Sequence, residues 1–162
     1  MLTQKAKYGL RALEVLATDA PGTPRRNGSG TTMTIGDVAE RAGVPHKFLE
    51  AILLELRRHG FVESRRGKSG GYALARPAER IGVGDVIRAL DGPLAPIPCA
   101  SLTAYRPCAD CTDPGRCAIQ NLMRRVRDAT AAILDGTTLA TLAAADRAET
   151  RDDSLAELLT NS

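Results

Sequence analysis

Four cysteines are the residues of this chain whose type and spacing most clearly point to chemistry. Cys99, Cys108, Cys111 and Cys117 follow the pattern C-x8-C-x2-C-x5-C. Clustered cysteines in a protein without a secretory signal indicate metal or redox chemistry more than structural disulfides. Four thiolates could hold tetrahedral zinc or an iron–sulfur cluster. A set of labile thiols without metal is the third interpretation, and the residues leave all three open.

The segment around the cysteines has too few apolar residues to fold by itself. It contains Pro107, Pro114 and Gly115 but few residues that could build an apolar core. We therefore expect the loop to stay ordered only if something ties it down. Its C-x-x-C pair at 108–111 lacks the surrounding βαβ pattern of a thioredoxin-like redox motif.

A metal-dependent enzyme would need a general acid or base and a substrate pocket beside the metal. The loop offers only Asp110 and Asp113, which are ordinary turn residues. The two histidines, His46 and His59, lie far from the cysteines in sequence. We expect no enzyme and no small-molecule substrate.

A second feature is the basic, glycine-rich segment RRGKSGG at 65–71. The flanking runs 61–64 and 72–75 are expected strands, which makes the segment the turn of a β-hairpin. Its glycines allow close approach to a phosphate, and cations are supplied by Arg65, Arg66 and Lys68. A nucleotide phosphate loop is disfavoured because the G-x-x-x-x-G-K-[ST] pattern requires Gly five residues before Gly67, and that position is Val62.

Elements that precede this hairpin give it a context. Apolar spacing predicts a helix over 3–20, and Thr34 begins a second helix that stops at Gly43. Pro45 opens a third helix that ends at 59–60. A helix, a short turn with glycine, a helix and then a hairpin is the order of a winged helix-turn-helix.

The second half of the chain is expected to hold a long helix over 120–134. Leu122, Val126, Ala129 and Ile133 mark one face of it. So small a domain leaves that stripe without a partner, and pairing with its copy in a second subunit is the natural use. Shorter helices are expected at 81–90 and 138–145, and the polar residues beyond 146 form an expected disordered tail.

Composition narrows the class of protein. The chain has 162 residues, of which 43% are hydrophobic, and no run long enough for a membrane helix. Its first ten residues lack the apolar core of a signal peptide, so we expect a cytoplasmic protein without membrane contact. Residues 1–98 carry 15 Lys/Arg against 10 Asp/Glu, whereas 99–162 carry 7 against 9. A basic first part favours a nucleic-acid partner, and only 3% aromatic content disfavours single-strand stacking.

The chain resembles the IscR/NsrR/CymR-type family of bacterial winged-helix regulators over residues 1 to 142. The motifs that carry the resemblance are LTQKAKY at 2–8, IGDVAE at 35–40, FLE at 48–50, LRRHGFV at 56–62, RGKSGGY at 66–72 and IGVGDVI at 81–87. A cysteine loop before a long helix completes it. The resemblance implies a mainly α fold with a small β-hairpin wing and a long dimerisation helix.

The resemblance also implies a homodimer that binds double-stranded DNA with the third helix in the major groove. Mapped by motif, the leading end of that helix is formed by Pro45, His46, Lys47, Phe48 and Glu50. The wing contacts are Arg66, Lys68 and Ser69, next to Arg65, and the contacts near the first helix are Lys5 and Lys7. A Glu at the helix end can accept from cytosine N4.

The resemblance to the cysteine-rich members of the family implies that this protein carries an iron–sulfur cluster that controls its DNA affinity. Those members have three cysteines with five residues in each gap. Here the gap from Cys111 to Cys117 is kept, the first gap is longer, and Cys108 is additional. Gln120 replaces a histidine ligand, and Lys7 and Tyr8 stand where some members have a carboxylate. Cys108 is the simplest replacement, which gives an all-cysteine site for [2Fe–2S] or [4Fe–4S].

These inferences divide the chain into a winged helix-turn-helix domain at 1–92, a cysteine-rich loop at 93–119, a dimerisation region at 120–145 and a tail at 146–162. The leading hypothesis is a transcriptional repressor whose DNA affinity follows a cysteine-bound cluster. A second hypothesis replaces the cluster by zinc or by a thiol switch in which Cys108 pairs with Cys111 or Cys117. A third, a protein-binding winged helix, predicts no DNA affinity and no steep salt dependence.

Overall fold

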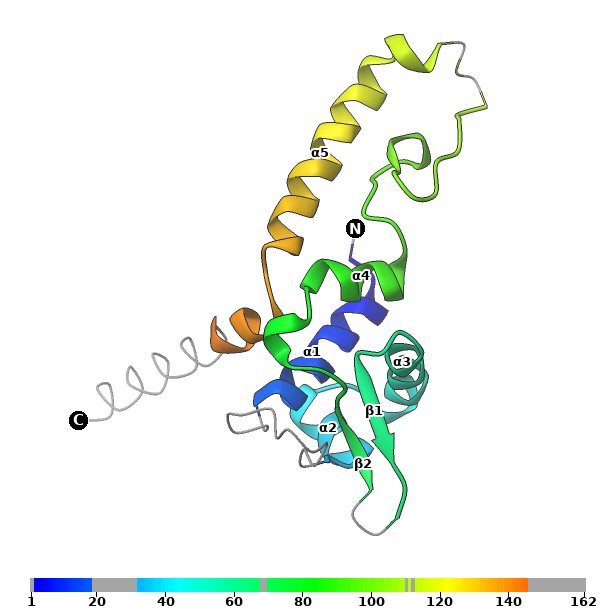
Figure 1. Cartoon of the computed structure of the whole chain (residues 1–162). Helices are drawn as coiled ribbons and strands as arrows, with labels where there is room; N and C mark the ends of the chain where they lie inside the picture. The colour runs from blue at the N-terminus through cyan, green and yellow to red at the C-terminus, as the bar shows by residue number, and fades with distance from the viewer. Residues whose placement is uncertain (1, 19–31, 68–69, 110, 112, 146–162) are drawn as a thin grey trace, which may run out of the picture.

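The computed structural model describes residues 2–18, 32–67, 70–109, 111 and 113–145. Predictions for Lys68, Ser69, Asp110 and the tail at 146–162 lie outside the described residues. The chain is mainly helical, with one two-stranded antiparallel sheet among the described residues (Figure 1). The predicted fold class, a winged helix-turn-helix followed by a long helix, is confirmed.

Three helices build the first part: α1 (Gln4–Thr18), α2 (Ile35–Ala42) and α3 (His46–Arg58). The Thr34 side chain accepts from the backbone N–H of Asp37, which is the expected cap at the start of α2. Gly43 ends α2 in the left-handed region at φ 61°, where a side chain would be strained. Pro45 stands just before α3 as its N-cap, one position earlier than predicted, because helical backbone begins at His46.

The hairpin consists of β1 (Val62–Arg65) and β2 (Gly71–Leu74), paired antiparallel so that Val62 faces Leu74 and Arg65 faces Gly71. Both strands are shifted by one residue from their predicted bounds, and the turn between them is basic and glycine-rich as predicted. Met33 extends the hairpin on its other edge through two backbone hydrogen bonds with Tyr72, at 2.8 and 2.9 Å. The wing is therefore fixed to the segment that leads into α2.

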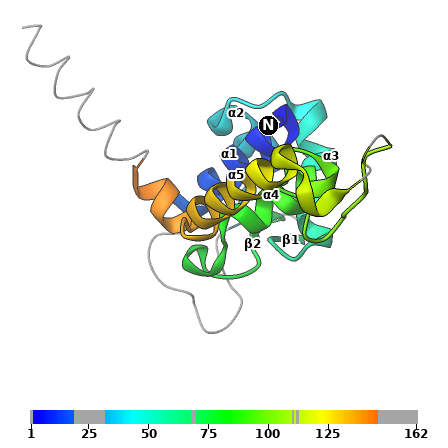
Figure 2. The same ribbon diagram turned by 90° about the horizontal axis from the view of Figure 1, so that it is seen from above.

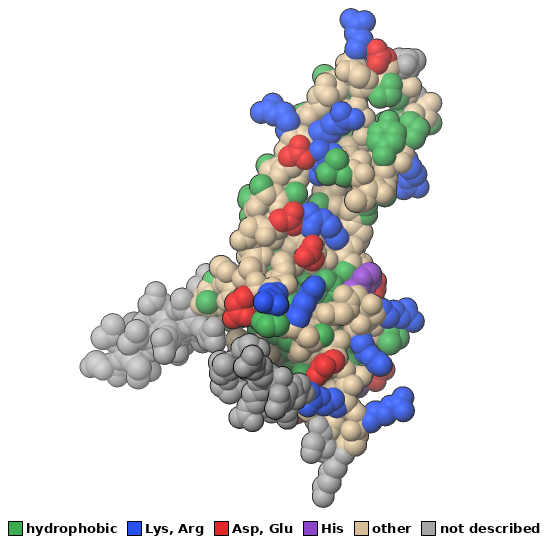
Figure 3. Space-filling view, viewed as in Figure 1, with side chains coloured by type: hydrophobic (Ala, Val, Ile, Leu, Met, Phe, Trp, Pro, Cys, Tyr) green, Lys and Arg blue, Asp and Glu red, His purple; other side chains and the backbone are tan. Residues whose placement is uncertain are grey.

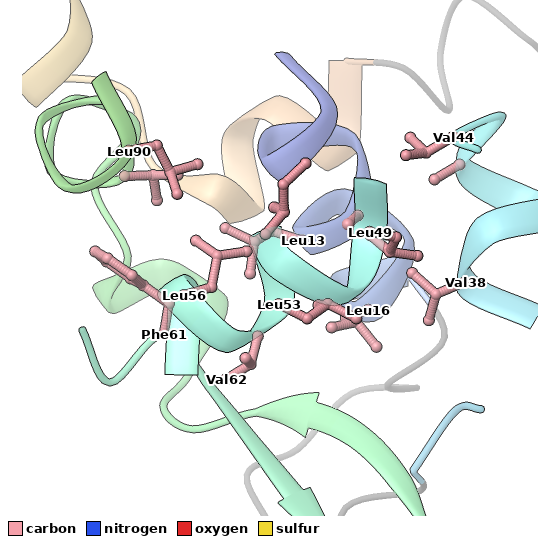
Figure 4. Packing of buried hydrophobic residues seen from close by; sticks show 14 of the residues in the cluster. Leu13, Leu16, Val38, Val44, Leu49, Leu53, Leu56, Phe61, Val62 and Leu90 are labelled. Carbon is pink, nitrogen blue, oxygen red and sulfur yellow. The ribbon is translucent and has the colours of Figure 1, made fainter. Parts of the chain in front are cut away.

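The apolar core lies between α1, α3 and the elements around them (Figure 4). Side chains of α1 and α3 point toward one another there, and those with no exposed surface include Leu13, Leu49, Leu53 and Leu56. Gly9 lets α1 approach α4 (Val83–Asp91) closely, because a Cβ at this position would meet Leu90 at 2.4 Å. A side chain at position 9 would force the buried Leu90 side chain to move.

A long helix, α5 (Ala118–Asp135), extends away from this core, with the cysteine segment running beside it (Figures 1 and 2). Short 3-10 turns occur at Ala78–Arg80, Pro98–Ala100 and Pro114–Arg116, and 139–145 is helical as expected. No helix in the described part of the chain is both long and apolar enough to cross a membrane.

The predicted apolar stripe of α5 is exposed. Its large side chains, Leu122, Val126 and Ile133, retain from 40% to 69% of their surface, and Ile119, which the prediction did not include, retains 67%. Gln120 is the only buried residue of α5, every residue of which is described. The helix thus presents apolar side chains that this single chain leaves uncovered.

Candidate nucleic-acid interface and cysteine loop

The leading end of α3 is exposed, as an interface requires. The predicted residues there, all on the surface, are Pro45, His46, Lys47, Phe48 and Glu50. Phe48 keeps 47% of its surface although its ring lies 6.3 Å from that of Tyr8, centroid to centroid. The Lys47 ammonium group lies 4.9 Å from the centroid of the Phe48 ring. The end of α3 therefore presents an aromatic ring with a cation over it.

Two of the residues predicted to contact DNA, Lys5 and His46, each lie next to a carboxylate of this chain. Lys5 Nζ lies 3.3 Å from both carboxylate oxygens of Glu55, which joins α1 to α3. His46 Nδ1 lies 3.8 Å from Glu50 Oε1, one helical turn further along α3. A DNA phosphate that approached Lys5 would have to compete with the Glu55 carboxylate for the Lys5 ammonium group.

The wing lies at the end of the molecule opposite the far end of α5 (Figure 1). Arg65 donates to Glu63 at 3.0 Å, so this cation also has a neighbouring carboxylate, whereas Arg66 is exposed at the start of the turn. Lys and Arg side chains gather over the part of the surface that α3 and the wing occupy, and others are spread along the upper half of the molecule (Figure 3). On the face shown, charge alone does not single out the region around α3 and the wing.

Two sulfur atoms of the cysteine loop are in contact. Cys99 is buried in the turn Pro98–Ala100, Cys108 is exposed, and the Cys108 thiol donates to the Cys99 sulfur over 3.6 Å. Cys117 is the N-cap of α5, and its sulfur accepts from the backbone N–H of Gln120 at 3.4 Å. Cys111 contacts Cys108 through the backbone, its N–H donating to the Cys108 carbonyl at 3.4 Å. None of the four forms a disulfide.

The cysteine loop is tied to α5 by two side chains that sequence reasoning did not assign to this role. The Gln120 amide donates to the Cys99 carbonyl at 2.8 Å, and Arg127 donates to the Ala100 carbonyl. Gln120 is 2% exposed, and its side-chain oxygen has no hydrogen-bond partner among the described residues. Nothing in the sequence distinguishes these two residues from other polar residues of the helix, since their partners are backbone carbonyls about twenty residues or more away.

The other end of α5 is tied to α4. Arg88 makes two hydrogen bonds to the Asp135 carboxylate, at 2.7 and 2.8 Å, and Asp85 lies 3.5 Å from Arg88 on the next turn of α4. These hydrogen bonds lower the pKa of Asp135 and raise the pKa of Arg88. Backbone hydrogen bonds from Val83 to Thr137 and from Leu139 to Ile81 complete the connection.

The four cysteines supply the kind of donor atom that a cluster or a zinc ion needs. Thiolate sulfur is the donor that iron–sulfur clusters and structural zinc prefer, so the donor set fits either group. Of the four sulfurs, Cys99 and Cys108 are brought into contact. Within the described residues, no three His, Cys, Asp or Glu side chains form a ready-made metal site. Closure around a metal would require the rest of the loop to converge on this pair.

The profile of the Rrf2 family, described as an iron-dependent transcriptional regulator, matches residues 2–145. The chain belongs to the Rrf2 family of transcriptional regulators. An rrf2-like HTH-type transcriptional regulator of Rhodobacter capsulatus is 43% identical to this Rrf2-family protein over 145 residues, covering 90% of this chain and 93% of the relative. The predicted family and the prediction that the protein is no enzyme are thereby confirmed.

Solved structures agree with this assignment. CymR, titled the global cysteine regulator of B. subtilis, superposes with a TM-score of 0.68 at 31% identity, over 89% of this chain and 96% of that one. IscR of T. potens gives a TM-score of 0.64 at 28% identity, over 88% of this chain and 85% of that one. Transcriptional regulation by a helix-turn-helix protein follows from the family, and DNA is the partner it implies.

Proposed function

We propose that this Rrf2-family protein is a homodimeric repressor whose DNA affinity is set by an iron–sulfur cluster on Cys99, Cys108, Cys111 and Cys117. One observation carries the proposal: Cys99 contacts the Cys108 sulfur with its thiol and holds Gln120 of α5 with its carbonyl. A change at the cysteines therefore has a direct route into α5. The family profile, described as iron-dependent, supports iron as the metal.

The DNA-binding part of the proposal uses the leading end of α3 and the wing. His46, Lys47 and Glu50 would face base edges in the major groove, and the exposed Phe48 ring suits contact with a thymine methyl. Phosphate contacts would come from Lys5, Lys7, Arg65, Arg66, Lys68 and Ser69. These contacts position the protein, whereas α3 supplies the specificity.

The homodimer would form along α5. The exposed stripe on α5 is the largest set of uncovered apolar side chains that one helix presents, and a second copy would cover it. Two recognition helices would then be held about one turn of DNA apart, roughly 34 Å. Because α5 carries both the dimer contact and the loop contacts, a shift of α5 would alter that spacing.

The cluster, when bound, would supply a cross-link among four sulfurs that oxidation or iron loss can remove. The residues of the chain then do the coupling. Gln120 and Arg127 hold the loop backbone to the first half of α5, and Arg88 with Asp135 holds the last turn of α5 to α4. Between these two attachments α5 links the cysteine loop to the helix-turn-helix.

Zinc or a thiol switch on the same cysteines is the second candidate. The 3.6 Å contact between Cys99 and Cys108 favours the thiol switch in the metal-free protein. Zinc proteins and disulfides are colourless, whereas iron–sulfur proteins absorb visible light. We expect protein purified without oxygen to be brown with near-equal iron and sulfide. A colourless protein that contains zinc, or that takes up no iron on reconstitution, would refute the cluster.

DNA binding has its own test, which needs no known operator. Affinity for a random-sequence duplex is measured against salt for the wild type, for Arg66→Ala and for Lys68→Ala. Each lost phosphate contact should reduce the salt slope by about 1 and weaken binding. Arg124→Ala, which removes an exposed cation from α5, is the matched control and should change neither value. Equal slopes in all four proteins would refute the wing assignment.

A further inference from the structure

We propose that Cys99 and Cys108 are a peroxide-oxidisable pair that closes a reversible disulfide in the metal-free protein. The Cys108 thiol donates to the Cys99 sulfur over 3.6 Å, so the two sulfurs are already in contact. A disulfide bond is about 2.05 Å long, and closing the remaining 1.5 Å or so needs only small side-chain and loop movements. This pair differs from the two pairings that the sequence suggests, Cys108 with Cys111 and Cys108 with Cys117.

The backbone between the two cysteines is already closed into a loop. The Arg106 N–H donates to the Pro98 carbonyl at 3.3 Å, which joins the residues next to Cys99 and close to Cys108. Inside the loop, the Ala104 N–H donates to the Ser101 side-chain oxygen at 3.0 Å. The loop-closure entropy that a new cross-link usually costs is therefore largely spent in the reduced state.

Burial assigns the two sulfurs different roles. Cys108 is exposed, whereas Cys99 retains 5% of its surface. Peroxide therefore reaches the Cys108 sulfur first, and Cys99 stays protected from over-oxidation until it reacts with its neighbour. An exposed attacking thiol beside a buried resolving thiol is the arrangement that a reversible thiol sensor requires.

The chemistry balances with hydrogen peroxide as the oxidant. The Cys108 sulfur attacks one peroxide oxygen, the O–O bond breaks, and the departing hydroxide takes the thiol proton to form water. The Cys99 sulfur then attacks the Cys108 sulfenic acid, the S–S bond forms, and hydroxide leaves with the Cys99 proton as a second water. Two thiols and one peroxide become one disulfide and two waters, and a dithiol reductant reverses the change.

The disulfide has a consequence that rests on the proposed function. It occupies two of the four sulfurs proposed for the cluster, so disulfide and cluster exclude each other. An oxidised apo protein would then stay without a cluster until it is reduced, even when iron and sulfide are available. The cross-link would also fix the residue whose carbonyl holds Gln120 of α5.

The test maps the disulfide in the full-length, metal-free, reduced protein after treatment with hydrogen peroxide. Remaining thiols are alkylated, and the protein is digested with chymotrypsin and Asp-N. Cleavage after Tyr105 and before Asp110 and Asp113 places each cysteine on its own peptide. We expect a cross-linked pair of the Cys99 and Cys108 peptides, which dithiothreitol separates. A dominant link that involves Cys111 or Cys117, a link between chains, or four thiols that all stay alkylatable would overturn the proposal.

Two variants give the matched comparison. Cys108→Ser should lose the cross-link and Cys111→Ser should keep it, because only the first removes one of the two sulfurs in contact. Reconstitution with iron and sulfide then separates this inference from the proposed function. We expect oxidised wild type to take up less than a tenth of the iron that the reduced protein takes up. A reduced protein that takes up no iron while the Cys99–Cys108 link still forms refutes the cluster alone.

Discussion

The helix-turn-helix body and the arm that follows it are stabilised in different ways. In the body, which comprises α1 to α4 and the hairpin, leucines of α1 and α3 meet with no exposed surface (Figure 4). In the arm, which comprises the described residues from 98 to 135, a glutamine is the one buried residue of an 18-residue helix. Apolar side chains of that helix face outward instead.

This difference shows where the protein can respond to a signal. The core of the body is packed entirely by side chains of this chain, so its stability does not depend on a bound partner or on the state of the cysteines. Apart from the buried Cys99 and Ala100, the contacts that hold the arm are a few hydrogen bonds to backbone carbonyls and one ion pair to α4, each of which contributes little. Its arrangement therefore depends on what covers α5 and on the state of the cysteines.

The largest expected effect comes from a cavity in the body. Leu53 of α3 is completely buried, whereas its neighbour Leu54 keeps 47% of its surface. Leu53→Ala should lower the free energy of unfolding by about 2–5 kcal/mol, because lost burial and a cavity add together. Leu54→Ala on the same helix should lower it by less than about 0.5 kcal/mol. Urea titration followed by circular dichroism measures both, and similar losses would contradict the assignment of Leu53 to the closed core of the body.

The second effect concerns association along the arm. Leu122→Asp places a charge in the middle of the exposed stripe of α5. If α5 pairs with its copy, burying that carboxylate should weaken the dimer at least tenfold, which is about 1.4 kcal/mol. Asn121→Asp puts the same charge on an adjacent, already polar face and is the control. Sedimentation velocity should show a monomer for the first variant and a dimer for the second, with unchanged helix content in both.

The sequence was informative wherever local chemistry decides the structure. The caps at Thr34 and Gly43, the basic hairpin and the exposed stripe of α5 follow from residue type and periodicity. The contacts that organise the arm do not, because Gln120 and Arg127 bind backbone carbonyls, which leave no mark in the sequence. The sulfur contact between Cys108 and Cys99, nine residues earlier, likewise follows from no spacing motif in the sequence.

A smaller effect should follow when the loop is detached from α5. Gln120→Ala and Arg127→Ala each remove a hydrogen bond to the Cys99–Ala100 backbone, which contributes about 0.5–1.5 kcal/mol. Local opening should become up to about tenfold more frequent, and chymotrypsin should cut faster after Leu102 and Tyr105. Arg124→Ala serves as the control on the same helix. Unchanged cleavage rates in both variants would show that the loop is held by something else.

The smallest expected effect is the stabilisation by the ion pair between Arg88 of α4 and Asp135 of α5. The pKa of Asp135 determines in which direction this stabilisation changes with pH. Hydrogen bonds from Arg88 lower the pKa of Asp135 from its usual 3.8. A carboxyl group with a lowered folded-state pKa stabilises the protein above its unfolded-state pKa, and this contribution disappears as the pH falls through the folded-state value. Arg88 stays protonated throughout, so Asp135 alone sets the transition.

Asp135→Asn should therefore cost about 0.2–1 kcal/mol of unfolding free energy at pH 7, since both partners are partly exposed and screened by solvent. The difference from wild type should shrink as the pH falls below 3.8 and vanish only below the lowered folded-state pKa of Asp135, where the wild-type carboxyl group is also neutral. Asp85 lies further from Arg88, at 3.5 Å, so Asp85→Asn should lower the unfolding free energy by less at pH 7. A difference between wild type and Asp135→Asn that persists undiminished in acid would mean that Asp135 holds α5 by its shape rather than by its charge.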